Sequence, residues 1–132
     1  METLKFVRWM NSFITKGKRK PEDILRDQII DKLKRKGWFA KSTHGSMFQS
    51  GFPDIFATHQ RYGHRWIEVK MPGRRGNVFT PAQHKTFPLL CQAGSGVWVL
   101  TSDSEVEYKK LFRGYNWYQY MPVSRVNSRL KI

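Results

Sequence analysis

Residues 53–70 read PDIFATHQRYGHRWIEVK and combine two strand-like segments with a turn signal between them. The flanking residues 53–58 and 65–70 contain the β-branched and aromatic side chains that are typical of strands. Between them, Arg61-Tyr62-Gly63 predicts a three-residue hairpin loop with Gly63 in the left-handed conformation that such loops require. This stretch is therefore expected to form an antiparallel β-hairpin.

Three charged side chains are expected to converge at the open end of this hairpin. In the predicted register Asp54 faces Lys70 and lies diagonal to Glu68, and Glu68 and Lys70 share a face because side chains two apart on a strand point the same way. Phosphodiester hydrolysis needs such a set, because carboxylate oxygens bind Mg²⁺ or Mn²⁺ and a lysine neutralises charge that develops on the phosphate. Gly51 permits a close backbone approach, so we expect substrate to pass near it.

Each piece of this pattern also has a structural explanation. A Glu-x-Lys pair on a strand is common as a salt bridge, and a Pro-Asp pair is an ordinary way to begin a strand, where proline is tolerated. The Pro-Asp pair and the Glu-x-Lys pair are stronger evidence together, because one hairpin joins them in a strongly basic chain. The combination favours a phosphodiester-cutting site.

Further elements are expected on both sides of the hairpin. Upstream, the apolar spacing predicts a helix over residues 22–36, and a strand follows over residues 38–43. Downstream, a helix is predicted over residues 80–93 and a buried strand over residues 97–100. The order α-β-β-β-α-β predicts an α/β domain.

The segments outside this core differ from it in composition. We expect the core over residues 21–101, preceded by a basic and amphipathic arm over residues 1–20 and followed by an extension over residues 102–132 with a short helix near 103–112. The arm carries apolar residues at helical spacing, namely Phe6, Trp9, Met10 and Phe13. The extension carries aromatics that could stack on bases or anchor a dimer, namely Tyr115, Trp117, Tyr118 and Tyr120.

The charge balance indicates the partner. Lys and Arg total 24 against 10 Asp and Glu, so the net charge is +14, which favours polyanions and above all nucleic acid. A single cysteine excludes an internal disulfide and fits a reducing, intracellular setting. The sequence contains neither a signal-peptide pattern nor an apolar run long enough to cross a membrane.

Two basic runs are candidate phosphate contacts. One precedes the first core helix and the other follows the lysine of the hairpin, and an ordinary solvated surface is the alternative for both. The candidate DNA-binding residues are Lys16, Lys18, Arg19, Lys20, Arg74 and Arg75.

The motifs resemble those of the PD-(D/E)xK nuclease superfamily and, within it, the virus-type replication-repair nuclease (VRR-NUC) family. The resemblance covers about residues 22–100 and rests on residues 51–54, 66–70 and 80–83, which read GFPD, WIEVK and TPAQ. It implies a restriction-endonuclease-like core, a mixed central sheet flanked by helices. It further implies that Asp54, Glu68 and the Val69 carbonyl bind a metal ion and that Lys70 is the catalytic lysine.

The resemblance also implies active-site roles for a glutamate on the first helix and a glutamine after the lysine strand. They fall on Glu22 and Gln83. Glu22 shares the stripe of the buried leucines, so it is a further candidate metal ligand, although a first-turn acid also compensates the helix dipole. Gln83 equally fits a capping box with Thr80 as the helix cap.

Together these features predict a divalent-metal-dependent DNA endonuclease that recognises structure. By resemblance, the expected form is a homodimeric Holliday junction resolvase, because a four-way junction has two equivalent strands related by a two-fold axis. A flap or nonspecific DNA nuclease is the alternative within the class. A non-catalytic basic nucleic-acid-binding protein is the alternative from another class.

Overall fold

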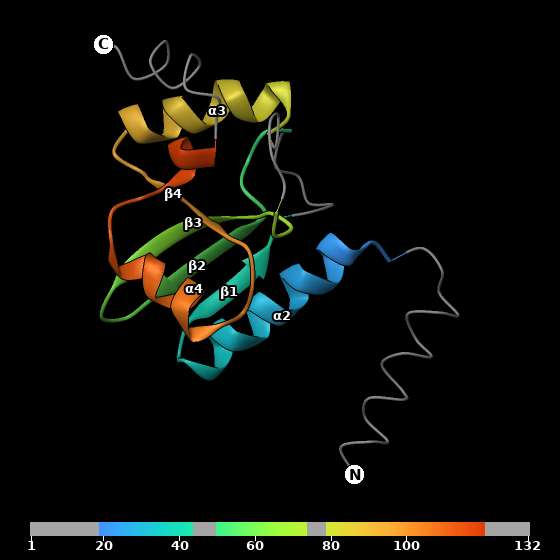
Figure 1. Ribbon diagram of the computed structural model, residues 1–132. Helices are drawn as coiled ribbons and strands as arrows, with labels where there is room; N and C mark the ends of the chain where they lie inside the picture. Colours follow the sequence, from blue (N-terminus) through green and yellow to red (C-terminus); the bar gives the residue numbers. More distant parts are fainter. Residues whose placement is uncertain (1–18, 44–49, 74–78, 121–132) are drawn as a thin grey trace.

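The computed structural model describes residues 19–43, 50–73 and 79–120, and these form one mixed α/β domain (Figure 1). Its four-stranded sheet has the order β1-β2-β3-β4, in which β1/β2 and β2/β3 are antiparallel and β3/β4 are parallel. The predicted order α-β-β-β-α-β is confirmed. In chain order the elements are α2 (Pro21–Arg35), β1 (Phe39–Ser42), β2 (Ile55–His59), β3 (Gly63–Val69), α3 (Pro81–Gln92), β4 (Val97–Leu100), α4 (Glu105–Lys109), and the 3-10 turns η1 (Lys110–Phe112) and η2 (Trp117–Tyr120).

Helices pack on both faces of the sheet. Figure 1 shows α3 on one side and α2 with α4 on the other. The apolar residues at helical spacing in the arm, Phe6 to Phe13, lie outside the described residues. None of the helices in the described ranges has the length and apolar character needed to cross a membrane.

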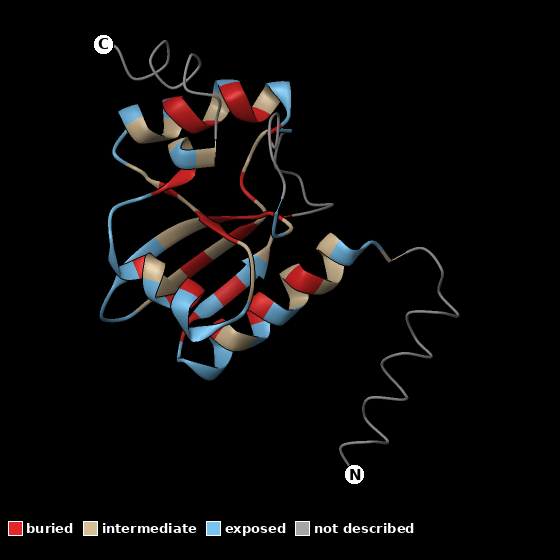
Figure 2. Cartoon of the chain, in the orientation of Figure 1, coloured by how far each residue is buried: buried red, intermediate tan, exposed pale blue. Residues whose placement is uncertain are grey.

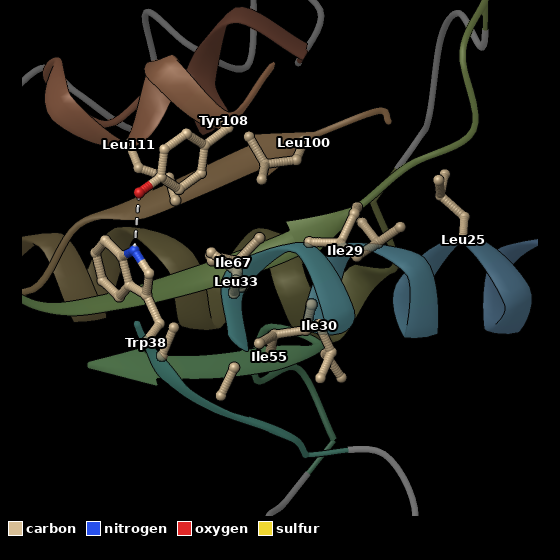
Figure 3. Packing of buried hydrophobic residues seen from close by; sticks show 13 residues of the cluster. Leu25, Ile29, Ile30, Leu33, Trp38, Ile55, Ile67, Leu100, Tyr108 and Leu111 are labelled. Atoms are coloured by element: carbon tan, nitrogen blue, oxygen red, sulfur yellow. Dashed lines mark hydrogen bonds between the residues drawn. The ribbon is translucent and has the colours of Figure 1, made fainter. Parts of the chain in front are cut away.

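Helix α2 forms where its sequence predicts. Proline at its first position, acids in the first turn and bases in the last turn all suit a helix dipole. Leu25, Ile29 and Leu33 are buried at helical spacing and pack against the β1–β3 part of the sheet (Figure 3). Full burial of one such side chain contributes about 1.5–3 kcal/mol, so this stripe fixes α2 on the sheet.

Residues 102–120 contribute to the core on both faces. Tyr108 and Leu111 are buried on the α2 side, where Trp38 Nε1 donates a hydrogen bond to Tyr108 Oη at 3.1 Å (Figure 3). On the α3 side Trp117 is 0% exposed and packs with Phe87. The expectation that Trp117 is available for bases or for a partner subunit is therefore wrong, because it lies in a buried cluster with residues of α3 and β4. Figure 2 shows the buried residues of α3 and β4 in red.

The hairpin register differs from the predicted one by two residues. Gly63 has the predicted left-handed conformation, with φ +80°, but it begins β3 and pairs with His59 instead of closing the loop. Ile55 pairs with Ile67. In the same antiparallel register, Asp54, which precedes Ile55, lies opposite Glu68, which follows Ile67. The two acids are thus direct neighbours across the hairpin, where the predicted register placed Lys70 opposite Asp54.

Candidate active site

Asp54 is held by the backbone of both neighbouring strands. Its carbonyl oxygen accepts a hydrogen bond from Thr43 N at 2.8 Å, which continues the pairing of β1 with β2. Its side-chain Oδ2 accepts a hydrogen bond from Val69 N at 2.9 Å. The carboxylate is therefore fixed against β3, one residue from Glu68.

Glu68 is 1% exposed and lies near the end of β3, where its carboxylate oxygens have unequal surroundings. Oε2 accepts hydrogen bonds from Lys70 Nζ at 3.0 Å and from Gln83 Nε2 at 2.9 Å. Oε1 is buried, and no donor among the described residues reaches it. A buried acceptor without a donor is costly, and either a proton shared with Asp54 or a bound cation would satisfy this oxygen.

Gln83 caps α3 and also contacts Glu68. Its backbone N donates to Thr80 Oγ1 and its Oε1 accepts from Thr80 N, so the predicted capping box is confirmed. The amide nitrogen of the same side chain remains free to donate to Glu68. The cap thus orients the amide toward the acidic pair.

The two carboxyl groups are protonated more readily than usual. Burial, and then the nearby charge of Asp54, raise the pKa of Glu68 from 4.5 to about 8, against the opposing effects of Lys70 and Gln83. Burial also raises the pKa of Asp54, although the Val69 N–H acts in the other direction. In the absence of a cation, the pair therefore tends to retain a proton.

These residues fit a hard divalent cation. Two adjacent carboxylates, one of them with a bare buried oxygen, form an oxygen donor set of the kind that Mg²⁺ and Mn²⁺ prefer. No group of three His, Cys, Asp or Glu side chains converges in residues 19–43, 50–73 or 79–120, so Glu22 does not join the pair as a third acid. A metal here would need non-carboxylate ligands, such as the Val69 carbonyl.

Gly51 allows a close contact within the protein itself. Its φ is +99°, and a Cβ atom built on it would lie 2.7 Å from Thr86 Oγ1 and 2.8 Å from the Ala82 carbonyl oxygen. The close neighbour is thus helix α3. Gly51 therefore has a packing role, which ties the residues before Asp54 to the helix that carries Gln83, and the passage of substrate near it stays a prediction.

Phe79 is a site residue that the sequence analysis missed. It is 4% exposed, and Lys70 Nζ lies 5.4 Å from the centroid of its ring. Phe79 directly precedes the helix cap and meets His84 edge-on at 6.0 Å between ring centroids. This contact joins the N′ and N4 positions of a helix, so a hydrophobic staple around Thr80 was the available signal.

Few of the candidate DNA-binding residues fall in the described ranges. Lys16, Lys18, Arg74 and Arg75 lie outside them. Arg19 is paired with Asp27 on α2, and Lys20 is exposed immediately before that helix. Contacts of Arg19 and Lys20 with DNA remain predictions.

The comparisons with known proteins agree with this architecture. A solved structure described as a VRR_NUC domain superposes with a TM-score of 0.54 and 20% sequence identity, over 69% of this chain and 95% of that one. No protein-family model and no curated protein matches the chain. The class that the sheet and its helices define is the mixed α/β fold. More narrowly, the chain shares its fold with that VRR_NUC domain, as its motifs predicted.

Proposed function

We propose that this chain is a divalent-metal-dependent nuclease. Its active site, formed around Asp54 and Glu68, would hydrolyse the phosphodiester bonds of DNA. The observation that carries the proposal is the unequal environment of Glu68. Lys70 and Gln83 occupy one of its oxygens, while the other is buried and receives no hydrogen bond from the described part of the chain. The fold shared with a VRR_NUC domain supports the same proposal.

The side chains then have separate tasks. Asp54, Glu68 and the Val69 carbonyl would hold Mg²⁺ or Mn²⁺, which polarises a bound phosphate and lowers the pKa of a bound water. Lys70 supplies a positive charge beside the reacting phosphate, where negative charge develops in the transition state. Gln83 positions Glu68 by hydrogen bonding and is not itself expected to touch substrate.

The alternative class is a basic protein that binds nucleic acid without cutting it. Such a protein gains nothing from two adjacent acids, which repel phosphates, and burying Glu68 with Lys70 costs desolvation energy. A catalytic role explains why this cost is retained, so we favour the nuclease.

The finer proposal concerns the substrate and the assembly. A homodimer that resolves four-way DNA junctions fits the resemblance of the motifs and the two-fold symmetry of the junction. A flap nuclease or a nonspecific nuclease would use the same chemistry. Cleavage of matched junction, flap and duplex substrates distinguishes these three.

The nuclease proposal is tested with supercoiled plasmid in Mg²⁺, in Mn²⁺ or in chelator. We expect metal-dependent nicking by the parent chain and its loss, by at least about a hundred-fold, in Asp54→Asn and Glu68→Gln, because each removes a charged ligand. Asp31→Asn is the matched control, since Asp31 is an exposed acid on α2. A Glu68→Gln variant that cuts at the parent rate would falsify the assignment.

A further inference from the structure

The described residues cover one face of the sheet over only half of its width. Their core between α3 and the sheet contains Val97 and Val99 of β4, with Trp66 of β3 at its edge, and none of its members comes from β1 or β2. The register places Phe56 beside Trp66 and Lys41 beside Phe56 on this same face. No described helix packs on the β1–β2 half, which we call the open face.

The open face carries a row of aromatic rings that leads to the acidic pair. Ring centroids are 5.6 Å apart for Phe52 and Trp66, 5.1 Å for Trp66 and Phe56, and 6.3 Å for Phe56 and His64. Phe52 is two residues before Asp54, so one end of the row adjoins the candidate active site. The other end reaches exposed His64 at the start of β3.

The outer edge of this face combines the most exposed described aromatic ring with a positive charge. Phe39 is 56% exposed on β1, and Lys41 Nζ lies 5.9 Å from the centroid of its ring. Ala40 between them is buried on the α2 side, which confirms that Phe39 and Lys41 share the open face. An exposed phenylalanine on an edge strand is a liability unless it contacts a partner.

We propose that the open face binds an unpaired strand of nucleic acid and leads it to Asp54 and Glu68. Flat rings stack on exposed bases, and Lys41 neutralises a neighbouring phosphate. Paired bases are stacked inside a duplex and present only their edges in its grooves, so a duplex cannot use these rings. The net charge of +14 favours a polyanion on this face, and a second copy seated there is an outcome that the test distinguishes. The inference rests on the proposed function and, among its three candidate substrates, favours a flap or other DNA with a single-stranded segment over a fully paired four-way junction.

The test measures binding of a labelled 15-nucleotide oligothymidylate and of a 15-base-pair duplex by fluorescence anisotropy in chelator. Phe39→Ala should weaken oligothymidylate binding by about five-fold or more, since stacking contributes about 1–3 kcal/mol per base, and should leave duplex binding nearly unchanged. Lys41→Ala should weaken both and reduce the salt slope by about one. Leu89→Ala is the matched control, because Leu89 is 54% exposed on α3.

Three outcomes would overturn the inference. Phe39→Ala could bind oligothymidylate as the parent does, it could weaken the duplex equally, or it could change the mass in light scattering, which would make the open face an interface between copies. Because binding is measured in chelator, it is independent of cleavage. Failure of the parent to cut any DNA would reject the nuclease proposal while leaving the stacking result interpretable.

Discussion

The amide of Gln83 joins helix formation to the chemistry of the site. Its oxygen completes the cap of α3, and its nitrogen binds the most deeply buried carboxylate of the candidate active site. A capping box was foreseeable from Thr80-Pro81-Ala82-Gln83, and so was an active-site role by resemblance. That the capping side chain also contacts Glu68 depends on where β3 lies relative to α3, which local spacing does not encode.

The two roles of Gln83 can be separated with two substitutions. Thr80→Ala removes the cap acceptor and should lower the free energy of unfolding by about 1 kcal/mol, while the hydrogen bond from Gln83 to Glu68 keeps cleavage near the parent rate. Gln83→Ala should cost similar stability but slow single-turnover cleavage by about ten-fold or more. Urea denaturation and single-turnover assays measure the two effects. Equal losses of activity in both variants would mean that Gln83 acts only through the helix.

The raised pKa of Glu68 predicts how the metal-free protein responds to pH. Because its pKa is about 8 in the folded chain and 4.5 ordinarily, the folded state holds a proton that the unfolded state releases between these values. The free energy of unfolding should therefore fall as pH rises from about 4.5 to about 8. Glu68→Gln cannot ionise at this position and should lack that decline. Urea titrations in chelator across this range compare the two, and parallel pH profiles would contradict the assignment.

At the scale of elements, the strands and their alternation were predictable, and the register was not. A one-residue slip would turn every buried side chain of β2 toward solvent, so the burial pattern excludes it. A two-residue slip keeps each side chain on its face, so the alternation of buried and exposed residues does not exclude it. The observed pairing of His59 with Gly63 differs by this amount. It brings Asp54 directly opposite Glu68, which the pattern alone could not establish.

Two glycines with similar backbone conformations should differ in their tolerance of alanine. Gly63 has φ +80° and open space around it, so Gly63→Ala should cost only the left-handed conformation, about 1–2 kcal/mol. Gly51 has φ +99°, and a Cβ there would also collide with α3. Gly51→Ala should therefore destabilise the fold more and slow cleavage, because the residues leading to Asp54 must shift. Thermal melts and plasmid nicking measure both. An equal loss of stability in the two variants would show that α3 moves away from the added Cβ atom without destabilising the fold.

At the scale of the whole molecule, the aromatics after β4 show what composition cannot decide. Tyr115 is 38% exposed whereas Trp117, two residues later, is fully buried against Phe79 and Phe87. Nothing in the local sequence distinguishes them, because burial depends on where α3 crosses the sheet. The burial of Trp117 also removes part of the argument for dimerisation, since this domain encloses more of its aromatic surface than its length suggested.

The proposed homodimer remains a prediction about surfaces that the fold leaves exposed. Large apolar side chains away from the open face could meet a second copy, namely Leu89, Val106, Phe112 and Tyr115. Light scattering at micromolar concentration should then give twice the 15.6 kDa of one chain. Two sites in one assembly should linearise a cruciform plasmid by paired cuts, because both strands are cut before the junction is released.

Mixing subunits tests whether those paired cuts come from one assembly. An excess of Glu68→Gln subunits should place a single working site in most dimers, so the product should change from linear plasmid to nicked circles. Asp31→Asn subunits at the same excess should leave linear product, since that exposed acid lies outside the site. A monomeric mass with nicked circles only, unchanged by the inactive subunits, would reject junction resolution while leaving the nuclease chemistry of Asp54 and Glu68 intact.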